Sequence, residues 1–318
     1  HSVGLFFGGG SLLLLGGLAL SRWLLGLVGG SGAPGLSIRG LGVRNASRRL
    51  SRSLVVVALL ACGCFMVLAV SSMQEDVTAN ADKRWSGTGG FELFGTATLP
   101  VPEKLGDASM RERFGLDRED ALADVRILSL KLYDGDDASC FNLNRARSPR
   151  IYGVPTQALA ALQAFEARHG NAELWALLDR ELPDGSVPGL AGDSDTATWG
   201  LGKRVGADGD AIAYRDEQGD LFNVKLVGKL PMRLSVFQGA VLVAERDFAA
   251  RFPSLDGYRA FLFDVPGDAG AAREALSRRL DPVGLELTTT VERLQRFYSV
   301  EATYLAMFLV LGGLGLVL

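Results

Sequence analysis

The chain has 318 residues, of which 48% are hydrophobic, and a formal net charge of −3. The charge is unevenly distributed: six arginines and no acidic residue precede Met73, which leaves 27 basic and 36 acidic residues, a net −9, after it. An acidic remainder of this size argues against nucleic-acid binding. Cys140 is the only cysteine after Cys64, so no disulfide can form within that remainder.

Residues 1–29 contain an uncharged run from Val3 to Leu20, followed by Arg22 and Trp23. This pattern predicts a transmembrane helix, since Arg and Trp suit the headgroup boundary. The six glycines of the run would permit close contacts between helices in lipid. A signal peptide is the alternative, although no basic region precedes the run.

Residues 30–52 are predicted to be a cytoplasmic linker followed by a basic amphipathic helix. The linker is the Gly-rich stretch 29–35, and Val43, Ala46, Leu50 and Leu54 then recur at helical spacing. We expect this helix to lie on the inner leaflet with its arginines toward lipid phosphates. The alternative is that these charges only set the topology. The candidate membrane-surface and topology residues are Arg39, Arg44, Arg48, Arg49 and Arg52.

Residues 53–73 are uncharged and almost wholly apolar between Leu54 and Val70. About 20 helical residues cross a hydrocarbon core of roughly 30 Å, so this segment predicts a second transmembrane helix. A buried core helix of a soluble protein is the alternative. The positive-inside rule places the short arginine-rich loop in the cytoplasm and residues 74–298 outside.

Residues 74–298 alternate strand and helix patterns, which predicts a large α+β domain. The expected strands are 91–94, 124–132, 211–214, 221–230, 241–244, 259–265 and 285–289. The expected helices are 156–169, 171–182, 245–252 and 269–280. A last helix, capped by Thr290, is expected to run without a breaker into a third, truncated span at 299–318. Gly312, Gly313 and Gly315 are predicted helix-packing residues of that span.

No residue pattern predicts a catalytic site, a cofactor or a metal. His169 precedes Gly170 at the end of a helical pattern, which favours a C-terminal cap. Three acidic clusters, at 134–137, 193–195 and 208–210, lack the twelve-residue calcium-loop pattern and are interpreted as solvated turns. The stretch 199–202 (WGLG) is interpreted as a tight turn, with ligand contact as the alternative. No phosphate loop is present, so any ATPase is expected in a separate subunit.

Several strings together resemble the FtsX-like permease family, the membrane subunits of MacB-like and LolC/LolE-like ABC transporters. They are LGVRNASRRLSRSL at 41–54, DTATWGLGKRVGADGDAIAY at 195–214, GAVLVAERDFAARFPS at 239–254 and GYRAFLFDVP at 257–266. The resemblance covers nearly the whole chain, and the order of its parts carries it. The helix at 1–29 departs from the four-span form and suggests the second half of a duplicated permease.

The resemblance implies a MacB-type periplasmic domain in two lobes and a multi-pass protein of the bacterial inner membrane. It also implies a homo- or heterodimer of permeases, membrane lipid contacts and a partner ABC ATPase. The ATPase would drive movement of the periplasmic domain for export or extraction of lipoprotein, lipid, peptide or drug. The alternative is an FtsX-type regulator whose ectodomain binds and activates a cell-wall hydrolase without transport. A membrane-tethered enzyme is a third, weaker alternative, because no nucleophile is paired with a base.

Overall fold

The computed structural model describes residues 2–30, 45–72, 80–136, 148–167 and 173–317. The chain divides into two compact units. One combines His1–Glu75 with Glu301–Leu318, and the other is Asp76–Val300. The second unit is called the sheet domain below.

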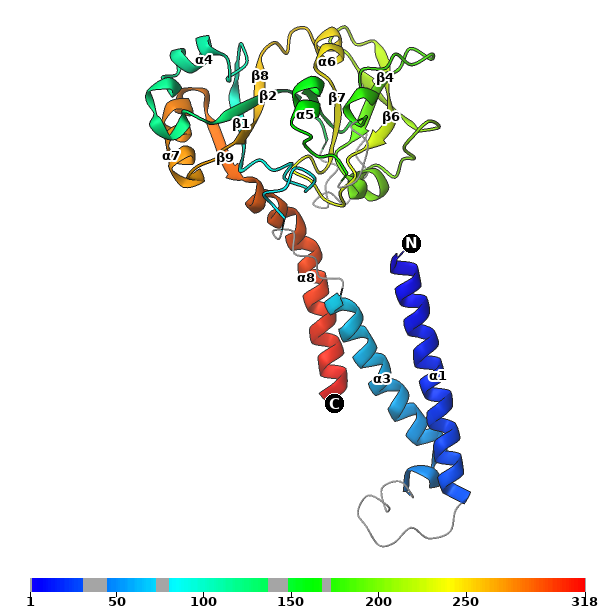
Figure 1. Ribbon diagram of the computed structural model, residues 1–318. Coiled ribbons are helices and arrows are strands. Elements are labelled where there is room, and N and C mark those ends of the chain that lie inside the picture. Colours follow the sequence, from blue (N-terminus) through cyan, green and yellow to red (C-terminus); the bar gives the residue numbers. More distant parts are fainter. Residues whose placement is uncertain (1, 31–44, 73–79, 137–147, 168–172, 318) are drawn as a thin grey trace. The chain divides into compact units, whose positions relative to one another are not determined.

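The first unit contains the long apolar helices α1 (Ser2–Gly30) and α3 (Leu50–Ser72) (Figure 1). The segments Gly4–Leu27 and Leu50–Ala69 are long and apolar enough to cross a membrane, with 0% and 6% of their apolar windows buried. A core helix of a soluble protein would be mostly buried, so these exposed apolar faces are consistent with membrane helices.

Close packing between α1 and α3 depends on one glycine. A Cβ on Gly10 would lie 2.4 Å from Cε2 of Phe65, so the absence of a side chain at Gly10 leaves room for this ring. Phe7 completes the contact, with its ring centroid 6.3 Å from that of Phe65 in an edge-on arrangement. The expectation that glycines allow helix contact therefore holds at Gly10. At Gly4, Gly8, Gly9, Gly16 and Gly17 an added Cβ would meet nothing within 4 Å.

The third predicted span is helical, and among its described residues the apolar stretch is shorter than a candidate crossing. Helix α8 (Thr290–Val317) runs unbroken from the sheet domain, as expected, and its apolar part is the shorter stretch Ala302–Leu311. Two helices of the described residues therefore meet the length and apolarity needed to span a membrane.

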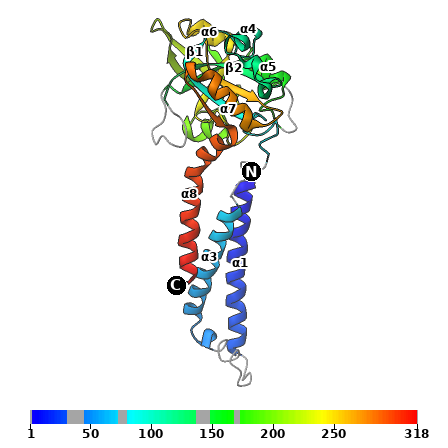
Figure 2. The same cartoon turned by 90° about the vertical axis from the view of Figure 1, so that its left-hand side faces the viewer.

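The sheet domain is built on one mixed sheet of nine strands, in the order β5-β6-β4-β7-β3-β2-β8-β1-β9. Figures 1 and 2 show its helices lying along both faces of this sheet. The strands are β1 (Leu93–Val101), β2 (Arg126–Tyr133), β3 (Arg150–Val154), β4 (Val187–Ala191), β5 (Ala211–Arg215), β6 (Leu221–Lys229), β7 (Ala240–Ala244), β8 (Tyr258–Asp264) and β9 (Leu285–Thr289). The α-helices are α4 (Ala108–Arg113), α5 (Thr156–Ala161), α6 (Glu245–Arg251) and α7 (Ala269–Leu280).

Strands from both ends of the domain form one half of the sheet. The order β9-β1-β8-β2 is antiparallel throughout, with α4 joining β1 to β2 and α7 joining β8 to β9. Numbered along the chain, the four strands lie in the order 4-1-3-2, which is the split βαβ arrangement of ferredoxin-like folds. The other half, β3 to β7, is an insertion between the second and third of these strands.

Alternating side chains divide the core between the two faces of the sheet. On β7, Val241 and Val243 join the cluster that includes Phe248 of α6, whereas Leu242 joins the cluster that includes Phe165. A strand buried on both faces reads as an unbroken apolar run, as 240–244 (AVLVA) does. A third cluster packs α4 and α7 onto the ferredoxin-like half.

Two predicted helices are largely wrong. The helix predicted at 156–169 ends after Ala161, because the backbone of Gln163 and Phe165 takes positive φ angles of 51° and 60°. Phe165 leaves the helix to be fully buried, and its N–H donates to the carbonyl of Arg84. In the described part of 171–182 only a short 3-10 turn forms, Trp175–Leu177, with Trp175 fully buried. His169 and Cys140 lie outside the described residues.

The C-terminal half follows its expected order. The hairpin of β5 and β6, the strand–helix pair of β7 and α6, and the segments α7 and β9 lie where the sequence predicts them. The sequence predicts no strand at the positions of β3 and β4. Strand β4 contains Pro188 and a register shift at Gly189, so its residues carry no strand signal of their own.

Candidate functional site

A crevice opens where two parallel neighbouring strands end. Strand β3 ends at Val154 and leads into α5, and β7 ends at Ala244 and leads into α6. Leu159 of α5 and Phe248 of α6 belong to core clusters on opposite faces of the sheet. Chain connections that leave for opposite faces create a crevice at the carboxyl ends of the strands, the usual place for ligands in open α/β sheets. The pocket here has a volume of about 610 Å³.

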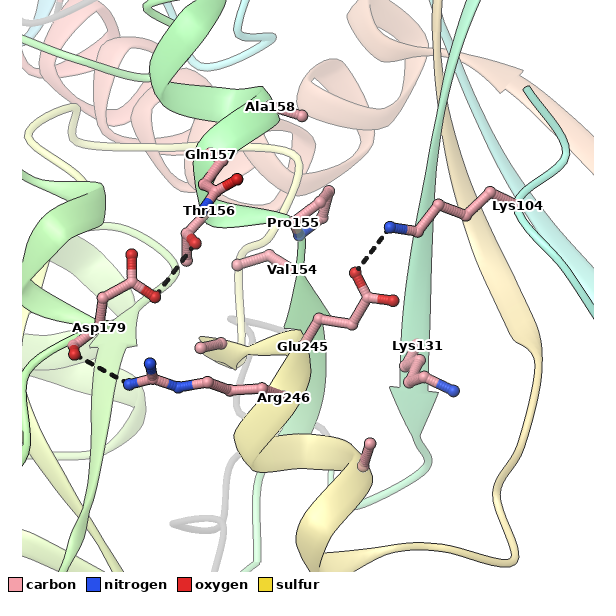
Figure 3. A pocket seen from close by; sticks show the side chains of 12 residues that line it. Lys104, Lys131, Val154, Pro155, Thr156, Gln157, Ala158, Asp179, Glu245 and Arg246 are labelled. Carbon is pink, nitrogen blue, oxygen red and sulfur yellow. Dashed lines mark hydrogen bonds and ion pairs between the residues drawn. The ribbon is translucent and has the colours of Figure 1, made fainter. Parts of the chain in front are cut away.

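Glu245 is the central carboxylate of this crevice. The hydroxyl of Tyr258 donates a hydrogen bond to its Oε1, and Nζ of Lys104 lies 3.4 Å from its Oε2 (Figure 3). Burial, together with the hydrogen bond to Glu245, raises the pKa of the Tyr258 hydroxyl above its ordinary value. The hydroxyl therefore stays protonated and remains a donor at neutral pH.

Lys131 brings a nearly buried ammonium to the same side of the crevice. Its side chain is 8% exposed, and its Nζ lies 3.3 Å from Oδ1 of Asp256 and 5.0 Å from the centroid of the Tyr258 ring. Lys131 is paired in register with Gly153 of β3. A Cβ on Gly153 would lie 2.8 Å from Cβ of Phe248, so this glycine lets α6 approach the sheet.

The opposite wall is built around Asp179. The hydroxyl of Thr156 donates to its Oδ1 at 3.2 Å, and the guanidinium of Arg246 donates to its backbone carbonyl at 2.9 Å. Figure 3 shows Thr156 and Arg246 meeting Asp179 on one side of the opening, with Lys104 and Glu245 on the other. The pocket is thus lined by paired charges of both signs, which suits a polar ligand or a peptide better than an apolar one.

The arrangement contains no evident catalytic pair. Thr156 is the hydroxyl residue that lines the crevice, and its hydroxyl donates a hydrogen bond to the carboxylate of Asp179. Within the part of the chain that the structure describes, no histidine lines the crevice to act as a base for this hydroxyl. Across the described residues no group of three or more His, Cys, Asp or Glu side chains could hold a metal ion.

The predicted topology residues are partly visible. Arg48, Arg49 and Arg52 are exposed at the start of α3 and just before it, and Ala46 and Leu50 are half-buried, which agrees with an amphipathic segment. Residues 45–48 are helical, and the Ser53 hydroxyl donates to the carbonyl of Ala46 at 2.9 Å. Arg39 and Arg44 lie outside the described residues.

The predicted packing glycines lie in α8. Gly312, Gly313 and Gly315 are all in helical conformation. At Gly313 a Cβ would meet nothing within 4 Å, so the described part of the chain offers no helix packed against it. A packing role for these glycines stays a prediction.

One acidic cluster is not the solvated turn expected from sequence. Asp193 is fully buried, and its two oxygens accept hydrogen bonds from the N–H of Thr196 at 2.6 Å and of Ser235 at 3.0 Å. Burial raises the pKa of Asp193 to about 6. Asp134 and Asp210 instead pair with arginines, Arg259 at 2.7 Å and Arg204 at 2.9 Å.

The junction between β9 and α8 is the second candidate functional feature, because α8 leaves the sheet domain there. Thr290 is buried and its hydroxyl donates to the carbonyl of Phe91, while Nε of Arg293 donates to the carbonyl of Val236 at 2.8 Å. The Arg293 guanidinium lies 4.2 Å from the centroid of the Phe94 ring. Leu294 is part of the core. The first turns of α8 are therefore fixed to the sheet domain.

The comparisons with known proteins add no relative. No protein-family model matches the chain, and the curated proteins contain no significant match to it.

The crevice residues come from segments scattered between 104 and 249, and no spacing in the sequence groups them. The sequence signal closest to this site is the pair of apolar strands β3 and β7, because the crevice lies at their carboxyl ends.

Proposed function

We propose that this chain is part of a permease subunit of an ABC transporter, similar to the FtsX-like and MacB-like family. Its task would be to couple ATP hydrolysis in a partner ATPase to movement of the sheet domain. The proposal places the protein in the bacterial inner membrane as a multi-pass dimer, with residues 74–298 outside the cytoplasm. The cargo class is lipoprotein, lipid, peptide or drug.

The observation that carries the proposal is the unbroken helix α8. It begins at Thr290, directly after the last strand of the sheet, and continues to Val317 through the apolar stretch Ala302–Leu311. Thr290, Arg293 and Leu294 are fixed to the sheet domain, so the proposal takes α8 as the element that passes movement to the sheet. A helix with intact hydrogen bonds is stiff along its axis, which suits mechanical coupling.

The composition of the chain supports the same assignment. Two apolar helices are long enough to cross a membrane, and no phosphate-binding loop occurs in the sequence. The proposal therefore assigns ATP hydrolysis to a partner subunit. The crevice beside Glu245 then offers a polar surface on the moving domain for a cargo or an adaptor.

The test is purification of the full-length protein under mild detergent from cells that express its neighbouring genes. We expect an ATPase with a Walker motif to copurify, and its ATP hydrolysis to depend on the permease. Recovery of the protein without such an ATPase would contradict the proposal. Copurification of both an ATPase and a cell-wall hydrolase, with no bound lipid, peptide or lipoprotein, would replace transport by regulation.

A further inference from the structure

Trp199 is an exposed aromatic side chain on a rigid support. It is 77% exposed, although the sheet domain buries most of its large apolar side chains. It belongs to a five-residue π-helix, Thr196–Gly200. Short π-helical turns occur frequently at functional sites.

Buried hydrogen bonds hold this π-helix in place. Asp193 accepts from the N–H of Thr196, and the N–H of Gly239 donates to the Thr196 hydroxyl at 2.8 Å. Ala197 and Leu201, on either side of Trp199, are buried. The backbone that carries Trp199 is therefore held by buried hydrogen bonds and buried neighbours, and this anchored backbone keeps the Trp199 side chain exposed.

The support is joined to the edge at which the chain enters and leaves the sheet domain. The N–H groups of Ser194 and Asp195 donate to the carbonyls of Met232 and Arg233 at 3.1 and 3.2 Å. Arg233 lies over the Tyr298 ring of α8, 5.9 Å from its centroid. Both views place the lime-green segment near residue 200 on the side of the sheet domain where α8 begins (Figures 1 and 2).

The same edge receives the chain from α3. The N–H of Val236 donates to the carbonyl of Gly87 at 2.9 Å. A Cβ on Gly87 would lie 2.2 Å from the carbonyl oxygen of Leu234, so the two segments are in direct backbone contact. The segment 232–236 therefore contacts the first described part of the domain, the start of α8 and the support of Trp199. We call this region the attachment edge.

Chain length fixes how far the attachment edge can lie from an apolar environment. Tyr298 precedes Ala302, the first residue of the apolar stretch of α8, by four residues. Four helical residues rise about 6 Å, and even a fully extended chain of four residues spans no more than about 14 Å. The headgroup layer of a bilayer is roughly 5–8 Å thick on each side. If α8 enters the membrane at Ala302, as the proposed function requires, the attachment edge is within reach of lipid headgroups.

The charges around Trp199 are compatible with this position. Arg204 pairs with Asp210 at 2.9 Å and Arg233 with Asp195 at 3.8 Å, while Lys203 is exposed. Paired charges leave no strong repulsion from a lipid surface of either net charge. Trp is the side chain that most favours the boundary between hydrocarbon and water, because its ring is apolar and its N–H is a donor.

We propose that Trp199 inserts into the headgroup layer of the membrane and forms a lipid contact of the sheet domain beside α8. The proposal rests on the membrane attachment of the proposed function. It adds a second point of support besides the helices, so that tilting of the domain would withdraw Trp199 from lipid or press it in.

The experiment uses the full chain reconstituted into phosphatidylcholine and phosphatidylglycerol vesicles, with or without brominated acyl chains. Bromine quenches tryptophan emission at short range. Subtracting the emission of Trp199→Phe from that of the unchanged protein isolates the Trp199 component, since Trp23, Trp85 and Trp175 are common to both. We expect brominated lipid to remove most of this component. A Trp199 component that brominated lipid leaves intact would overturn the proposal.

A matched control comes from the other end of the same lobe. Leu221 is 67% exposed and begins β6, whose last residue, Lys229, precedes the attachment edge. Eight strand steps separate Leu221 from Lys229 by about 26 Å. The Leu221→Trp probe, placed in the Trp199→Phe protein, should keep its emission in brominated lipid. Equal quenching of both probes would overturn the proposal, because it would show a domain lying on its side.

The two proposals fail separately. The quenching measurement requires no ATPase, so absence of a copurifying ATPase would overturn the permease assignment and leave the lipid contact standing. An unquenched Trp199 in a protein that does bind an ATPase would overturn the lipid contact alone.

Discussion

At the scale of single residues, buried polar groups hold the loops of the sheet domain. Asp193 fixes the turn before the π-helix through two backbone N–H groups, and Arg293 fixes the start of α8 through the carbonyl of Val236. Each replaces hydrogen bonds that a loop would otherwise make to water. The loops that carry Trp199 and the helix junction therefore behave as parts of the core.

Asp193 gives a prediction for the pH dependence of stability. Its pKa is about 6 in the folded protein, above the ordinary value of 3.8. The folded state therefore holds the proton more tightly. The stabilisation is complete below the unfolded pKa and is lost as pH rises through about 6. We expect this group to lower the free energy of unfolding by up to about 3 kcal/mol between pH 4 and 7, as measured by denaturant unfolding.

The comparison protein is Asp193→Asn, which cannot titrate at this position. The difference in unfolding free energy between the unchanged protein and this variant should fall as pH rises. Asp208→Asn removes an exposed carboxylate of the neighbouring loop and controls for the change of net charge. Parallel pH profiles for the unchanged protein and Asp193→Asn would show that the burial of Asp193 does not disfavour its charge.

At the scale of elements, α8 is the part on which the proposed coupling depends. Ser299 lies in its interior, and its hydroxyl donates to the carbonyl of Arg296 at 2.6 Å. Proline at this position removes a helix hydrogen bond and clashes with the preceding turn, at a cost of about 3 kcal/mol or more. We expect Ser299→Pro to abolish cargo movement while ATP hydrolysis in the partner continues.

The control for this break is Ser299→Ala, which removes the side-chain hydrogen bond and keeps the helix. It should retain cargo movement close to that of the unchanged protein. Transport assays and ATPase assays on the same reconstituted complex distinguish the two variants. Normal transport by Ser299→Pro would mean that α8 is not the coupling element.

At the scale of the whole molecule, two apolar helices and a large mixed-sheet domain share one chain. All three core clusters lie between Phe91 and Tyr298, within the sheet domain. By the positive-inside rule the arginine-rich stretch before Met73 would be cytoplasmic, and the proposed function places the sheet domain on the other side of the membrane.

This arrangement predicts a protease pattern in intact spheroplasts. Added protease should cleave within the sheet domain and leave the segment around Arg48 uncut, because only the former would be outside. Immunoblots against tags in the two regions would follow the cleavage. Cleavage near Arg48 before lysis, with the sheet domain intact, would show the opposite orientation.

The sequence by itself determined the apolar helices α1 and α3, the hairpin of β5 and β6, and the run from β7 to α8. These segments have a regular apolar period and clear turn or cap residues, so local information is enough. At 156–167 the local pattern was overruled: Leu159 and Phe165 are both buried, but Phe165 reaches the core through a positive φ angle and a bond to Arg84. Burial of the Phe165 ring therefore stabilises the fold more than continuation of the helix beyond Ala161 would.

Only the tertiary structure decided where the candidate sites lie. The crevice at Glu245 exists because β3 and β7 are parallel neighbours whose connections leave for opposite faces, although their paired residues Val154 and Ala244 lie 90 positions apart in the chain. Trp199 is predicted from sequence to lie in a turn, whereas the structure joins the segment before its π-helix to 232–233, and Arg233 of that segment to Tyr298 of α8. Contacts between segments distant in the chain leave no periodic trace, because each depends on how separate elements pair.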